Sequence, residues 1–168
     1  MALIINLWSF SQILIALSLL MVSAVPLYIA GFYAFFPLVD IMVIYYWVSN
    51  RPSSMPIWFI FILGILRDAL EGISMGVNVF IYLLTAFTVM ASKSIYKRES
   101  FWLVWQGFAI TALISISIKW LLVSFEMGIP LTAGSAIMQL TFSIAVYPLF
   151  YWFFNIMQST MPKYLQDE

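Results

Sequence analysis

Cysteine and histidine are absent from this 168-residue sequence, and charged residues make up only 8% of it. The lack of cysteine excludes disulfides and thiolate nucleophiles, and the lack of histidine excludes imidazole bases and the usual zinc and haem ligands. Seven basic residues balance seven acidic ones, so no excess of positive charge points to a nucleic-acid partner. We therefore expect no nucleic acid, no cofactor and no metal, and any acid–base chemistry would have to use Asp, Glu, Lys or Tyr.

Hydrophobic residues are abundant: they account for 64% of the chain, and the mean hydropathy is +1.04. This composition predicts an all-α integral membrane protein, with a single transmembrane domain over residues 1–168. Charge, proline and glycine divide the chain into about six apolar segments. Each has about the length needed to cross a hydrocarbon core of roughly 30 Å. The predicted helices of this bundle are 9–28, 31–49, 57–75, 77–92, 101–122 and 133–156.

The charged residues near the ends of these helices predict the orientation of the chain. With six crossings, the N-terminus, the second and fourth connections and the C-terminal tail share one side of the membrane. That side also carries most of the basic residues in the connections and tail. By the positive-inside rule it is the cytoplasm, so both termini are expected there. Lys119 then lies near the outer surface, where its stem can snorkel, and Glu126 is expected to be a solvated loop charge. The basic residues on the cytoplasmic side are Arg51, Lys93, Lys97, Arg98 and Lys163.

Three charged residues, Arg67, Asp68 and Glu71, fall within the third predicted helix. An unpaired charge near the centre of a bilayer costs at least about 2.5 to 3.5 kcal/mol, so we expect charges here to be paired. Asp40 and Arg67 lie at similar depth, about 15 Å from the connection between the second and third helices. Arg67 can therefore form an interhelical ion pair with Asp40 or a local i,i+4 pair with Glu71. The sequence leaves both pairings open.

Small residues recur around the same charges. Gly64, Asp68, Gly72 and Gly76 follow one another at every fourth position, which predicts that they share one stripe along a helix. A stripe with so little side-chain bulk lets another backbone approach closely. It serves either internal packing against a neighbouring helix or an interface for a partner helix or a small ligand.

The region from residue 36 to 87 combines several recognisable features. It has a proline early in the second predicted helix, an aromatic end to that helix, a basic and proline-containing loop, and a Gly-x-x-x-Asp-x-x-x-Gly segment followed by another glycine. The residues concerned are Pro37, Tyr45-Tyr46-Trp47, Arg51-Pro52, Gly64, Asp68, Gly72 and Gly76. This pattern resembles that of the MreD family of rod shape-determining membrane proteins. Arg67 and Glu71 depart from the apolar or small residues expected beside the family's Asp.

The resemblance implies a non-enzymatic scaffold of the cell-elongation machinery in the bacterial inner membrane, which supports peptidoglycan synthesis and cell shape. Its implied partner is an MreC-like membrane protein and, indirectly, MreB, RodA and a penicillin-binding protein.

The family is also thought to share its six-helix fold with S components of energy-coupling factor vitamin transporters. A ligand-sized cavity lined by Asp68, Asn78 and Gln139 would favour that alternative, and a tightly packed interior would favour the scaffold. The two membrane carboxylates Asp40 and Asp68 lack the Gly-x-Gly-Asp arrangement of intramembrane aspartyl proteases, so we expect no catalytic residues.

Overall fold

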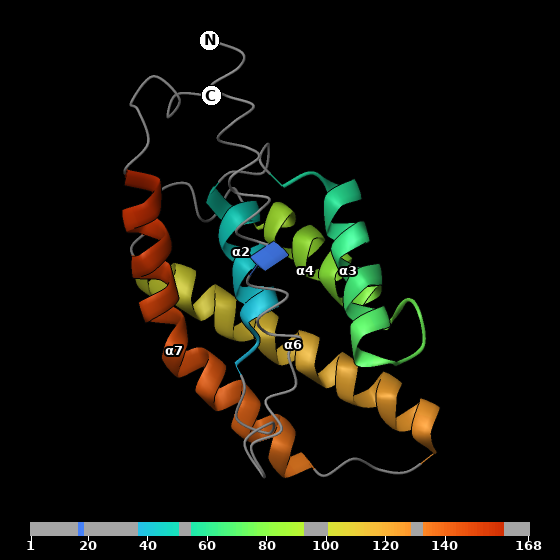
Figure 1. Ribbon diagram of the computed structural model, residues 1–168. Coiled ribbons are helices and arrows are strands. Elements are labelled where there is room, and N and C mark those ends of the chain that lie inside the picture. The colour runs from blue at the N-terminus through green and yellow to red at the C-terminus, as the bar shows by residue number, and fades with distance from the viewer. Residues whose placement is uncertain (1–16, 19–36, 51–54, 93–100, 129–132, 160–168) are drawn as a thin grey trace.

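The computed structural model describes residues 17–18, 37–50, 55–92, 101–128 and 133–159, and every regular element in these ranges is an α-helix (Figure 1). The predicted first helix, 9–28, lies outside the described residues except for positions 17 and 18, and so do residues 31–36 of the second predicted helix. The helices are α2 (Val39–Asn50), α3 (Ile57–Glu71), α4 (Val77–Ala91), α6 (Phe101–Met127) and α7 (Ala133–Ser159). Pro37 and Leu38 are not helical, so the prediction of one continuous helix over 31–49 is wrong and α2 begins only at Val39.

Helix α2 forms the centre of the bundle and packs against α4, α6 and α7. Nearly all of its side chains are buried, including the aromatic run Tyr45, Tyr46 and Trp47. The ring of Tyr45 meets Phe108 of α6 and Tyr147 of α7 edge-on, and those two rings stack with centroids 4.0 Å apart. A helix that is apolar all round is suited to such a central position. The aromatic end of the second predicted helix is therefore the core that joins α2 to α6 and α7.

Two helices in the described part of the chain are long and apolar enough to cross a membrane. They lie within α6, from Phe101 to Glu126, and within α7, from Ala133 to Ile156. Helices α3 and α4 have 15 residues each, which corresponds to about 22 Å. The bundle thus combines two long apolar helices with a short hairpin, α3 and α4, whose helices pack closely together.

The C-terminal ends of α3 and α6 differ most from the sequence prediction. Helix α3 ends at Glu71 rather than at residue 75, because Gly72 adopts a left-handed conformation (φ 67°) and its N–H bonds to the carbonyl oxygen of Asp68. Helix α6 continues to Met127, beyond the predicted end at 122, so Glu126 belongs to its last turn rather than to a loop.

Candidate functional site

The carboxylate of Asp68 binds the start of helix α4. Its Oδ2 accepts a hydrogen bond from the backbone N–H of Gly76 at 2.7 Å, and its Oδ1 accepts one from the N–H of Asn78 at 2.8 Å. The first N–H groups of a helix have no partner within the helix, and a negative charge there is also favoured by the helix dipole. Asp68 is fully buried. It therefore acts as an N-cap for α4 that is supplied by the preceding helix.

The glycines around Asp68 serve two different purposes. At Gly64 a Cβ atom would lie 2.5 Å from the Cα of Val79, so this position allows α3 and α4 to approach closely. Gly72 and Gly76 instead have positive φ angles of 67° and 115°, and a Cβ at either would meet nothing within 4 Å. The expectation of one continuous helical stripe is therefore wrong. Gly64 provides space for packing, whereas Gly72 and Gly76 provide the backbone conformations of the turn between the helices.

Arg67 makes both of the contacts that the sequence left open. Its Nε lies 2.8 Å from Oε1 of Glu71 and 3.8 Å from Oδ2 of Asp40. The contact with Glu71 is a hydrogen-bonded ion pair within α3, and the longer contact joins α3 to α2. Asp40 also accepts a hydrogen bond from the buried hydroxyl of Tyr82 in α4. Asp40, Arg67 and Tyr82 thus connect three helices through polar groups inside the bundle.

Lys119 of α6 completes this network, and the sequence reasoning did not assign it a partner. Its Nζ lies 2.9 and 2.8 Å from the two carboxylate oxygens of Glu71. The side-chain amide of Asn78 donates a further bond to Oε2 of Glu71 at 2.8 Å. The carboxylate of Glu71 therefore receives donors from α3, α4 and α6. A single lysine in the largely apolar C-terminal half of α6 was the available signal that a carboxylate lay opposite.

Glu126, expected to be solvated, fastens the turn between α3 and α4 to the end of α6. Its Oε1 accepts hydrogen bonds from the backbone N–H of Ser74 at 3.0 Å and from the Ser74 hydroxyl at 2.6 Å. Both residues are exposed, so this bond adds little stability by itself. The turn between α3 and α4 is therefore bonded at Ser74 to Glu126 of α6 and at Gly76 to Asp68 of α3.

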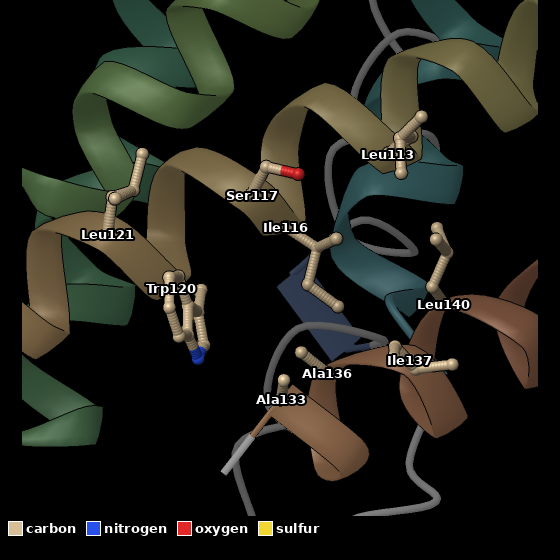
Figure 2. A pocket seen from close by; sticks show the side chains of 9 residues that line it. All are labelled: Leu113, Ile116, Ser117, Trp120, Leu121, Ala133, Ala136, Ile137 and Leu140. Carbon is tan, nitrogen blue, oxygen red and sulfur yellow. The ribbon is translucent and has the colours of Figure 1, made fainter. Parts of the chain in front are cut away.

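A pocket of about 320 Å³ lies between α6 and α7 (Figure 2). Asp68, Asn78 and Gln139 do not line it, and Asp68 and Asn78 are buried in the hydrogen bonds described above. In the described part of the chain, Asp68 and Asn78 therefore bond to the hairpin and do not face this pocket. The pocket is lined by Leu113, Ile116, Ser117, Trp120, Leu121, Ala133, Ala136, Ile137 and Leu140.

These features define the class of the protein: it is all-helical in its described part, strongly apolar, and carries two candidate membrane spans beside a short hairpin fastened by charges. The family model for rod shape-determining protein MreD matches residues 3–157. The chain therefore belongs to the MreD family, a membrane-associated family that determines rod shape. Neither the curated proteins nor the solved structures contain a match to this chain.

Proposed function

We propose that this protein is a non-enzymatic inner-membrane scaffold of the cell-elongation machinery. It crosses the membrane six times with both termini in the cytoplasm and binds an MreC-like membrane protein. Through that partner it acts with MreB, RodA and a penicillin-binding protein to support peptidoglycan synthesis and cell shape. Membership of the MreD family supports the assignment to rod-shape determination, and the helix hairpin supports the role of a scaffold.

One observation carries the scaffold proposal: the charged groups of the hairpin bond to one another and to charged groups of the neighbouring helices. Asp40, Arg67, Glu71 and Lys119 form a chain of alternating charges that links α2, α3 and α6. Asp68 joins α3 to α4 through backbone N–H groups. Buried ion pairs gain little net stability, because desolvation opposes the attraction, but removing one member leaves an uncompensated charge. Such a network favours one arrangement of the helices over others, which is what a scaffold requires.

The alternative is a substrate-binding S component of a vitamin transporter. That function needs a polar cavity for the vitamin. Asp68 and Asn78, two of the three polar residues expected to line it with Gln139, bond to groups of the hairpin itself. We therefore favour the scaffold.

Affinity purification tests the proposal. The tagged protein is isolated from its native membranes in mild detergent, and the proteins that accompany it are identified by mass spectrometry. We expect enrichment of an MreC-like protein, RodA and a penicillin-binding protein. A pair of ATPases with a membrane coupling subunit would instead identify a transporter component and overturn the proposal.

Two variants make the purification more specific. Gly64→Ala places a methyl group against the backbone of Val79, so it should loosen the hairpin and reduce recovery of the partner. Gly134→Ala makes the same substitution in α7, where a Cβ meets nothing within 4 Å, so recovery should stay at the wild-type level. Equal recovery with both variants would mean that the partner does not recognise the shape of the hairpin.

A further inference from the structure

The hairpin of α3 and α4 is short for a membrane-crossing element. Each helix has 15 residues and so rises about 22 Å, compared with a hydrocarbon core of roughly 30 Å. The exposed apolar side chains of α3 run from Ile57 to Leu70, a rise of about 20 Å. Gly72 and Gly76 end the helices at the turn with positive φ angles, so neither helix can extend in that direction without rebuilding the turn.

At its turn end this hairpin cannot compensate for its short length by tilting or by extending charged side chains. Tilting reduces the depth that a helix covers, so it increases the mismatch. Charged side chains near the end of a short helix can reach outward to the membrane surface. Here, however, Arg67 bonds to Glu71, and Glu71 also binds Lys119, so these groups are held inside the bundle.

The long helix α6 is compatible with a thin membrane. Helices α6 and α7 have 27 residues each, about 40 Å. Figure 1 shows α6 crossing the bundle obliquely to α3 rather than parallel to it. An oblique helix covers less depth than its length, so α6 can share a membrane with the short hairpin.

From these lengths we propose that the outer faces of α3 and α4 bind lipids in a locally thinned bilayer and prefer short acyl chains. The inference depends on the proposed placement of the hairpin across the membrane. The lipid-facing side chains of α3 include Trp58, Phe61, Ile62 and Ile65, all exposed, and α4 adds Phe80 and Phe87. A bilayer that thins around a short apolar surface avoids exposing its acyl chains to polar groups at the helix ends. The effect is confined to the hairpin side of the protein.

Selective quenching tests this preference. The chain has no cysteine, so a single fluorescent label can be attached at Ile62→Cys on α3 or, as a matched control, at Leu149→Cys on α7. The side chains of Ile62 and Leu149 are both exposed. Circular dichroism of each labelled protein checks that its helix content equals that of the wild type. The proteins are placed in vesicles of equal parts dimyristoleoyl and dierucoyl phosphatidylcholine, with a nitroxide quencher on the chains of one lipid or the other.

We expect the label at position 62 to be quenched about twofold more by the short-chain lipid, whereas the label at position 149 shows no such preference. Equal quenching by the two lipids at position 62 would overturn the inference, as would the same preference at both positions. A scaffold could still bind its partner in either case, so the affinity purification would be unaffected.

The placement of the hairpin is checked separately. Met75 lies in the turn between α3 and α4 and is 77% exposed. In intact cells, Met75→Cys should react with a maleimide that cannot cross membranes and is added from outside. A turn that reacts from neither side would lie within the membrane, so the hairpin would not cross it and the thinning proposal would fail.

Discussion

Replacing Gly64 with alanine should destabilise the protein by opening the contact between α3 and α4. The new Cβ would lie 2.5 Å from the Cα of Val79, 2.8 Å from its backbone nitrogen and 2.9 Å from its Cγ2. Two of these three atoms belong to the backbone, so no side-chain rotation relieves the contact. The helices must therefore move apart. This movement also strains the hydrogen bonds that the Asp68 carboxylate accepts from the start of α4.

The expected magnitude follows from two opposing effects. Overpacking of a tight contact costs about 1 to 3 kcal/mol, and more when backbone must shift. Alanine is better than glycine in a helix by about 1 kcal/mol, which offsets part of that loss. We expect a net loss of about 1 to 2 kcal/mol in the free energy of unfolding. Val79→Ala should not restore stability in this variant, because the backbone contacts remain.

Unfolding of the purified protein in mild detergent, titrated with sodium dodecyl sulfate and followed by circular dichroism, measures this loss. Gly134→Ala is the control, because it gains helix propensity without any clash and should be unchanged or more stable by about 0.5 kcal/mol. If Gly64→Ala is as stable as Gly134→Ala, the close approach of the two helices is not required, and the reasoning about this contact is refuted.

Three further predictions concern the same hairpin and use the same titration. Asp68→Asn should lower the free energy of unfolding by about 1 to 2 kcal/mol, because the amide nitrogen cannot accept a bond from an N–H group; an unchanged midpoint would exclude the capping role. Gly76→Ala should lower the free energy of unfolding more than Gly72→Ala does, because a φ angle of 115° is less accessible to alanine than one of 67°. Each variant should lose about 1 kcal/mol or more. Equal stability of both variants and the wild type would contradict this. Glu71→Gln and Lys119→Gln should show a coupling of about 1 kcal/mol in a double-mutant cycle, and strictly additive losses would argue against their ion pair.

The sequence predicted the starts of several helices well, because chemistry marks them locally. Helices α3 and α4 begin at residues 57 and 77, where sequence analysis placed them, directly after Pro56 and Gly76. The end of α3 was missed because glycines four residues apart suit both a helical stripe and a helix followed by a turn. Only the backbone angles of Gly72 and Gly76 distinguish the two, and these depend on the cap that Asp68 provides.

The partners of the buried charges were predictable only in part. The contact of Arg67 with Glu71 follows from helix geometry, and the contact with Asp40 from depth in the membrane. The contact of Lys119 with Glu71 does not follow in this way. Helix α6 is apolar on all sides, so its sequence has no polar face that would show which side meets α3. Tyr82, which bonds to Asp40, lies on the same buried face of α4 as Asn78 and Thr85, so the spacing of these residues was a signal that sequence analysis did not use.

Cell shape measured together with stability tests the central claim most directly: the buried carboxylates hold the helices in place and do no chemistry. Wild-type, Gly64→Ala and Asp68→Asn proteins are produced at equal levels in a normally rod-shaped bacterium from which its own MreD protein has been deleted. The ratio of cell length to width is then compared with the free energy of unfolding of each purified protein. We predict that rod shape is lost in proportion to stability, whichever residue is changed. An Asp68→Asn protein that is as stable as the wild type but leaves the cells round would contradict the claim.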